Sequence, residues 1–108
     1  MILYLFGKSP FEHRSNEIYF YIVEMQGRAG VDVRIVLLHG AVMVARRSNR
    51  FEERLRRLVD VGVKIYLRKE DLEARGISDK SLSDIGTPIE TREMMKLAAE
   101  SDTLVSVI

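Results

Sequence analysis

The stretch VDVRIVLL (residues 31–38) decides the fold class of this 108-residue chain. It is short, rich in β-branched residues and almost wholly apolar, as expected of a strand buried within a sheet. Similar runs at 1–6, 62–67 and 103–108 predict three more strands, and 81–86 is a further candidate. Strands of this kind are typical of a parallel sheet that helices cover.

Helical patterns separate these strands. The first helix is predicted from Ser15 or Asn16 to about Ala29. Asn49, with Glu52 three residues later, resembles a capping box at the start of a second helix. That helix has one apolar stripe, which is formed by Phe51, Leu55, Leu58 and Val59. Its opposite face is charged and is expected to lie in solvent.

The last helix is predicted to start near Thr87 or at Thr91 and to run to about Ser101. The alternation of strands and helices predicts an α/β domain with a parallel sheet and helices on both faces. The length fits one domain, residues 1–108. In such sheets functional sites gather beyond the carboxyl ends of the strands, here in loops 7–15, 39–49 and 68–80.

Composition excludes several classes of site. The chain has no cysteine, which excludes disulfides, thiolate metal sites and cysteine nucleophiles. A net charge of +1 gives no general attraction to nucleic acid or membranes. The apolar runs are too short to span a bilayer and the N-terminus lacks a signal peptide's pattern, so a cytoplasmic location is expected. Few amides beside many charged residues suit a thermophile.

The triplet Gly7-Lys8-Ser9 resembles the end of a phosphate-binding loop. A true loop of this kind needs a glycine four residues before the Gly-Lys pair and a helix that starts at once. The required position is Ile2, and Pro10 interrupts the loop. A Walker-type nucleotide site is therefore not predicted.

Two histidines, His13 and His39, lie in the loops beyond strand ends. Such a pair could form part of a metal site or an acid–base pair. No H-x-x-x-H pattern or carboxylate at ligand spacing accompanies them, so local hydrogen bonding is the preferred interpretation. No metal or cofactor is predicted.

The segment LRKEDLEARGI (67–77) concentrates charges after the third strand. A charged turn or short helix ending at Gly76 explains them, and so does a polar loop that faces a ligand or partner subunit. Composition leaves both interpretations open. The candidate residues are Arg68, Glu70, Asp71 and Arg75.

The first helix contains EIYFYIVEM (17–25), which is apolar at nearly every position. At about 100° per residue, its Ile18, Ile22 and Met25 are predicted to face the sheet, with Tyr19 and Val23 beside them. Phe20 and Tyr21 would then lie at the polar edge and stay exposed in a monomer. Because interfaces favour buried aromatic residues, the two predict an oligomer interface.

Several segments resemble the DsrE/DsrF/DsrH family, and its DsrH/TusB branch most closely. They are "SP" after the first strand, LLHGAV (37–42), KIYLRKEDLEARGI (64–77) and the final ETREMMKLAAES. The resemblance implies a three-layer α/β/α fold with a five-stranded parallel sheet. It also implies oligomers, notably hetero-hexamers of three related subunits, which relay persulfide sulfur for tRNA 2-thiouridine synthesis or sulfur oxidation.

In the DsrE/TusD branch the sulfur-carrying cysteine lies eight residues before the glycine of the Arg-Gly pair, a position that corresponds to Arg68. Arginine cannot accept sulfur because it has no thiolate. The segment LLHGAV also departs from the family's usual Gln-Asp-Gly. The resemblance implies a non-catalytic relay subunit that scaffolds a cysteine-bearing DsrE/DsrF-like partner, with no direct contact to nucleic acid. In this interpretation Lys8 and Ser9 lie at the rim of the family's site.

Two alternatives stay open. The first is a stand-alone homo-oligomer that holds a small anion through Lys8, His13, His39 and Arg68. The second is an enzyme that uses histidine acid–base chemistry.

Overall fold

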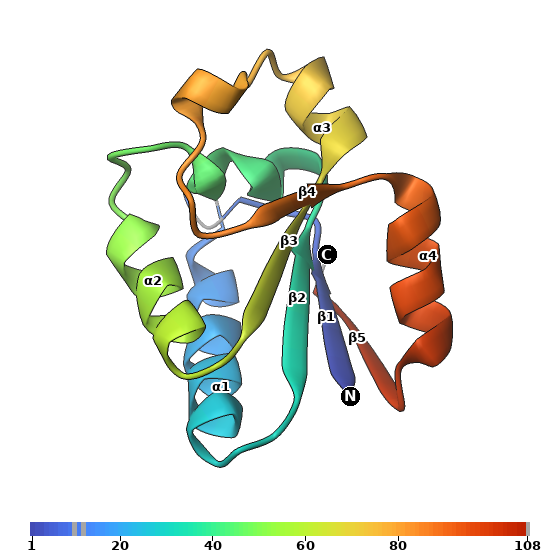
Figure 1. Ribbon diagram of the computed structural model, residues 1–108. Helices are drawn as coiled ribbons and strands as arrows, with labels where there is room; N and C mark the ends of the chain where they lie inside the picture. The colour runs from blue at the N-terminus through green and yellow to red at the C-terminus, as the bar shows by residue number, and fades with distance from the viewer. Residues whose placement is uncertain (10, 12, 108) are drawn as a thin grey trace.

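A parallel sheet forms the middle layer of the molecule, as the computed structural model shows (Figure 1). The structure describes residues 1–9, 11 and 13–107. The five strands are arranged in the order β4-β3-β2-β1-β5, and each pair is parallel. They are β1 (Ile2–Phe6), β2 (Val33–Leu37), β3 (Lys64–Arg68), β4 (Thr87–Ile89) and β5 (Thr103–Val107). Pro10 and Ile108, which the sequence analysis includes in a loop and a strand, lie outside the described residues.

Helices cover both faces of the sheet, which confirms the predicted three-layer α/β/α architecture. Helices α1 (Glu17–Arg28) and α2 (Glu52–Asp60) pack together on one face, and α4 (Thr91–Glu100) covers the other (Figure 1). The short α3 (Lys69–Ala74) follows β3 directly. Three 3-10 helices complete the chain: η1 (Arg14–Asn16), η2 (His39–Ala45) and η3 (Asp79–Ser81). Among the described residues, none of the helices is both long and apolar enough to cross a membrane.

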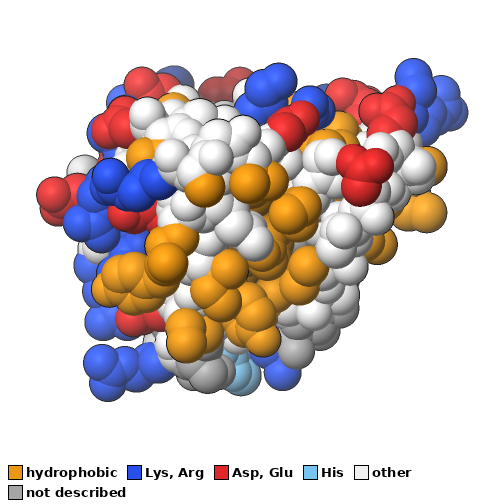
Figure 2. Space-filling view, turned by 90° about the horizontal axis from the view of Figure 1, so that it is seen from below, with side chains coloured by type: hydrophobic (Ala, Val, Ile, Leu, Met, Phe, Trp, Pro, Cys, Tyr) orange, Lys and Arg blue, Asp and Glu red, His pale blue; other side chains and the backbone are white. Residues whose placement is uncertain are grey.

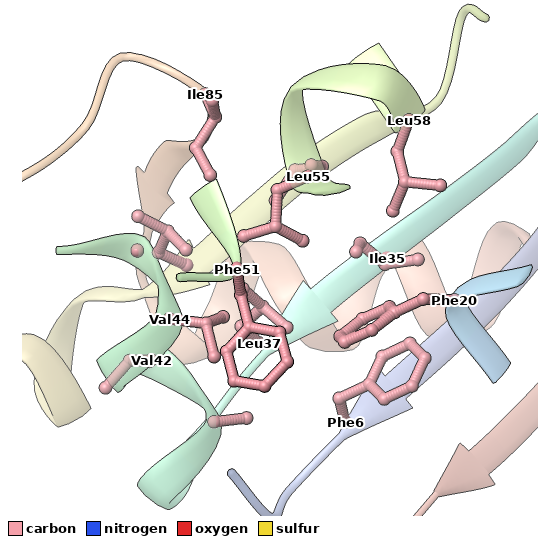
Figure 3. Packing of buried hydrophobic residues seen from close by; sticks show 14 of the residues in the cluster. Phe6, Phe20, Ile35, Leu37, Val42, Val44, Phe51, Leu55, Leu58 and Ile85 are labelled. Atoms are coloured by element: carbon pink, nitrogen blue, oxygen red, sulfur yellow. The ribbon is translucent and has the colours of Figure 1, made fainter. Parts of the chain in front are cut away.

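The larger core lies between the sheet and the helix pair α1 and α2 (Figure 3). Phe6 of β1 stacks on Phe20 of α1 with ring centroids 4.9 Å apart. Phe51, Leu55 and Leu58 contribute the α2 side, which confirms most of that helix's predicted stripe; Val59 is instead exposed. A smaller core on the opposite face packs Met94 of α4 against the sheet.

The predicted orientation of the first helix is wrong. Val23 is fully buried, as predicted, but so is Phe20, whereas Ile18, Ile22 and Met25 are 60%, 37% and 69% exposed. Both sets follow helical spacing, so the apolar pattern alone fits either face. The stacking of Phe20 on Phe6 of β1 shows which face packs on the sheet.

Two side chains of α1 contact arginines of α2. Glu24 Oε1 lies 3.7 Å from Arg57 Nε, and the Arg54 guanidinium lies 3.8 Å from the Tyr21 ring centroid. Because Phe20 is fully buried within the chain, it cannot belong to an oligomer interface. Tyr21 is half-exposed but is covered by Arg54.

The prediction of a strand at 81–86 is also wrong. This segment is a loop held by one antiparallel bridge between Leu82 and Arg46. The remaining strand is β4, which contains Pro88 and follows immediately. Because β4 is at the edge of the sheet, a proline there disrupts no inner hydrogen bonds.

The helix starts are close to expectation. Helix α4 begins at Thr91, where Glu90 and Glu93 form a capping box. Helix α2 begins at Glu52 rather than next to Asn49. The side chain of Asn49 accepts a hydrogen bond from the Phe51 N–H at 2.7 Å, and Glu52 accepts one from the Ser48 N–H. The two residues thus order the turn just before the helix.

Candidate functional site at the carboxyl edge of the sheet

The carboxyl ends of β1, β2 and β3 bring three segments to one edge of the sheet, at the top of Figure 1. They are the loop after β1, the η2 segment after β2, and α3 after β3. These are the segments in which the sequence predicts functional residues. The arrangement follows from parallel pairing, because it turns every strand end towards the same side.

A buried carboxylate, Asp71, lies at the centre of this edge and is only 6% exposed. One of its oxygens accepts hydrogen bonds from the His39 backbone N–H at 2.7 Å and from Arg68 Nε at 2.5 Å. The other accepts from Arg68 Nη2 at 3.1 Å and from Arg75 Nη1 at 3.4 Å. The fork of Arg68 therefore meets Asp71 in a bidentate pair, and Arg75 adds a weaker contact.

Burial alone would raise the pKa of Asp71. The Arg68 hydrogen bonds and the His39 N–H outweigh burial, and the net pKa is lowered. The same pair raises the pKa of Arg68, chiefly through its hydrogen bond to Asp71. Both groups are thus held in their charged forms. We call Asp71, Arg68, Arg75 and the His39 backbone the Asp71 cluster.

The cluster fixes the connection between two strands. His39 adopts a positive φ of 50°, which is uncommon for a residue other than glycine. The hydrogen bond from its N–H to Asp71 ties this turn to α3. The polar residues predicted at 68–75 therefore include two, Arg68 and Asp71, whose hydrogen bonds connect the ends of β2 and β3 and so have a structural role.

The remaining predicted residues are placed differently. Glu70 faces α4, where its carboxylate accepts a hydrogen bond from the Thr91 N–H at 3.0 Å, and this bond is the main cause of its lowered pKa. Ser9 is buried and accepts a hydrogen bond from the Phe11 N–H at 3.1 Å. Lys8 is exposed.

The structure does not make the two histidines a metal site. His13 donates its backbone N–H to the Ser9 carbonyl, and His39 takes part in the Asp71 cluster through its own N–H. Among residues 1–9, 11 and 13–107, no three His, Cys, Asp or Glu side chains gather as metal ligands would.

An open cavity of about 650 Å³ adjoins the Asp71 cluster. Ser9 and Phe11 line it from the loop after β1, and Arg75 lines it from the end of α3. The rest of the wall comes from the segment after β2, including Met43, Arg46, Arg47, Ser48 and Asn49.

Arg46 and Arg47 are not among the functional residues predicted from the sequence, which in this loop include only His39. The sequence pattern that could have identified them is the pair Arg46-Arg47 in VARRSN (44–49), which directly precedes two residues that favour turns.

Comparisons with known proteins support the fold and the family. The ychN protein from E. coli is 20% identical, with 97% of each chain covered and a TM-score of 0.81. The protein of unknown function MTH1491 from Methanobacterium thermoautotrophicum is 15% identical, with 97% of this chain and 96% of the other covered and a TM-score of 0.80. At these identities the likeness shows the fold alone.

No curated protein matches the chain. The model of the family described as DsrH like protein matches residues 8–104, which include the Asp71 cluster and the cavity. At the level of the family, this match supports a small subunit of the sulfur-relay type. The chain belongs to the DsrH-like family.

Proposed function

We propose that this protein is a non-catalytic, DsrH/TusB-like subunit that scaffolds a cysteine-bearing DsrE/DsrF-like partner in persulfide transfer. The persulfide sulfur would be used in tRNA 2-thiouridine synthesis or in sulfur oxidation. The observation that carries the proposal is the state of Arg68, which stands where the resemblance implies a sulfur-carrying cysteine. Its guanidinium is bound in a bidentate pair by Asp71, and its side chain is 19% exposed.

This arrangement cannot take up sulfur. A persulfide is attacked by a thiolate, and the chain has no cysteine. The pair between Arg68 and Asp71 keeps the loop folded in place of a reactive group. The role left to such a chain in a relay is to hold and orient a partner that carries the thiolate.

An apolar stripe on α1 supports the presence of a partner. Ile18, Ile22 and Met25 are exposed along this helix, and Leu104 of β5 is 48% exposed. Figure 2 shows hydrophobic side chains gathered over a broad area of the underside of the molecule. Strand β5 is also an edge strand, with one side free to pair. Exposed apolar surface of this kind is typical of subunit interfaces.

The same surface serves the alternative function, a homo-oligomeric protein that binds a small anion. The arginine-lined cavity favours this alternative, because Arg46, Arg47 and Arg75 contribute three positive charges to its wall. The two candidates differ in whether a cysteine-bearing partner is required. We favour the relay subunit because of the family to which the chain belongs.

Affinity purification of the chain from its native cells tests the proposal. We expect a cysteine-bearing protein of the DsrE type to co-purify in fixed stoichiometry. After incubation with a cysteine desulfurase and cysteine, mass spectrometry should find added sulfur on that partner and none on this chain. A stable sulfur adduct on this chain, or purification only as a homo-oligomer, would contradict the relay-subunit proposal.

Variants of α1 locate the contact. Ile22→Asp combined with Met25→Asp should release the partner, because each aspartate would be buried in an apolar interface. Met95→Asp on α4 is the matched control, since Met95 is 61% exposed and lies over the opposite face of the sheet. Equal retention of the partner by both variants would exclude α1 as the contact surface.

A further inference from the structure

The cavity beside the Asp71 cluster has an unusual balance of charge. Three arginines line it, and its wall includes no carboxylate among the described residues. Within that part of the chain, neither Arg46 nor Arg47 forms an ion pair. Arg75 shares Asp71 with the shorter Arg68 pair. The wall therefore carries positive charge that an anion can neutralise.

The backbone that carries Arg46 and Arg47 is fixed on several sides. The Arg47 N–H donates to the Ser81 carbonyl and the Ser83 N–H donates to the Ala45 carbonyl, each at 2.8 Å. The Asn49 side chain donates to the Val44 carbonyl at 2.7 Å. These bonds fix the backbone from which the two arginines extend, so binding a ligand would not have to order this segment.

The turn after this pair is strained. Ser48 has a φ of 61°, in the left-handed region that residues other than glycine rarely adopt. Its N–H is held by Glu52, which explains how the turn persists. Strained residues of this kind gather at ligand sites, because the surrounding structure must fix a particular backbone path.

The opposite wall of the cavity is apolar. Phe11 is 40% exposed and rests edge-on against Phe51, with ring centroids 4.7 Å apart. Met43 adds a flexible apolar surface on the side of η2. A volume of about 650 Å³ far exceeds one inorganic anion and falls in the usual range for small-molecule sites. The ligand should thus combine an anionic group with a flat or apolar body.

We propose that this cavity binds a phosphomonoester whose body is about the size of a nucleoside. The guanidinium fork of Arg46 matches the geometry of phosphate oxygens. The Arg47 guanidinium, which is anchored by a hydrogen bond from its Nε to the Leu82 carbonyl at 2.5 Å, adds a second positive charge. The Phe11 ring is 40% exposed, and the Arg50 guanidinium lies 5.2 Å from its centroid, so a planar group would stack on the exposed part of this ring beside Arg50. Ser48, which is exposed, adds a hydroxyl group to the wall. This inference does not depend on persulfide transfer, and it involves no Walker-type loop.

Calorimetry on the full chain tests the proposal with AMP, adenosine and inorganic phosphate in low-salt buffer without magnesium. We expect AMP to bind at least about tenfold more tightly than inorganic phosphate, because only AMP uses both walls. Adenosine alone should give no measurable binding. Equal affinities for AMP and phosphate, or binding of adenosine as tight as that of AMP, would overturn the proposal.

Variants locate the site. Arg46→Ala should weaken AMP binding about tenfold, since the Arg46 side chain is exposed and its loss leaves the fold intact. Arg46→Lys should recover part of the affinity through its charge. Arg92→Ala on the exposed side of α4 is the control, and it should bind AMP as the unmodified protein does. Unchanged binding by Arg46→Ala, or an equal loss in Arg92→Ala, would contradict this site.

Discussion

Two groups of arginines lie at the same edge of the sheet and differ in what balances their charge. In the Asp71 cluster, Arg68 meets a buried carboxylate in a bidentate pair. In the adjoining cavity, Arg46 and Arg47 lie on a fixed backbone and, among the described residues, have no carboxylate partner. The first group is paired within the fold. In the second group, Arg47 donates from Nε to the Leu82 carbonyl at 2.5 Å, whereas the exposed Arg46 carries a charge that a ligand can neutralise. Arg75 contributes to both.

The difference shows how one edge can serve two purposes. Buried charges must be paired, or they cost several kcal/mol each, so the cluster has little freedom to change. An exposed arginine without a carboxylate partner costs little folding free energy, because water solvates its charge, and it remains available to bind a ligand. The four predictions that follow compare the two groups, in order of the expected size of the effect.

The largest effect is expected from Asp71→Ala. The substitution leaves the Arg68 guanidinium and the His39 N–H without their acceptor, and breaking such a buried pair costs about 3 kcal/mol of unfolding free energy. Urea denaturation measures this loss. Glu73→Ala in the same helix is the matched control, because Glu73 is exposed, and it should change stability by less than about 0.5 kcal/mol. Similar losses in both variants would contradict a structural role for Asp71.

The second prediction concerns pH. Because the pKa of Asp71 is lowered below its ordinary 3.8 in the folded protein, its carboxylate contributes stability that is fully present above that value. This contribution is lost as the pH falls below about 4 and through the folded pKa. The stability difference between the unmodified protein and Asp71→Asn should therefore be constant at higher pH and shrink in this acidic window. Urea denaturation at a series of pH values checks it, and a constant difference throughout would argue against the lowered pKa.

An intermediate effect is expected from Arg75→Ala. Arg75 contacts Asp71 at 3.4 Å and its side chain is 34% exposed, so solvent screens the pair. We expect a loss of about 1 kcal/mol in unfolding free energy. Because Arg75 also lines the cavity, the affinity for AMP should fall in the same variant. A loss of stability as large as that of Asp71→Ala would place Arg75 wholly in the structural cluster.

The smallest effect on stability is expected from Arg46→Ala. The side chain is exposed, and such changes usually alter stability by less than about 0.5 kcal/mol. Removal of one of several like charges could even raise stability slightly. Thermal unfolding with and without AMP measures both values. A marked loss of stability without AMP would show that Arg46 is structural, as Arg68 is.

Much of the fold could be predicted from the sequence, because short apolar runs and helical spacing specify a parallel sheet with helices on both faces. The orientation of α1 could not be predicted, since Ile18, Ile22 and Met25 form as regular a stripe as Phe20 and Val23. The face that is buried is the one whose Phe20 stacks on Phe6 of β1, a contact that depends on tertiary structure. Strand β4 was missed because it is only three residues long and contains a proline.

The candidate site was predicted in part. The sequence indicated the charged segment after β3, and Arg68, Asp71 and Arg75 do meet there with His39. It could not show that Glu70, next to Asp71 in the chain, turns away to the start of α4. Nor could it show that the Arg46–Arg47 pair lies beside Ser9 and Phe11, because these segments meet only when β1 and β2 pair.

The most direct test of the account is a comparison of arginine Nε–H signals in the magnetic resonance spectrum of the isotope-labelled protein. The account predicts that the Arg68 signal exchanges slowly with water and does not move when AMP is added, because Asp71 holds that group. The Arg46 signal should exchange rapidly in the free protein and become protected and shifted with AMP. A shifted Arg68 signal beside an unchanged Arg46 signal would contradict the division of this edge into a structural and a ligand-binding group.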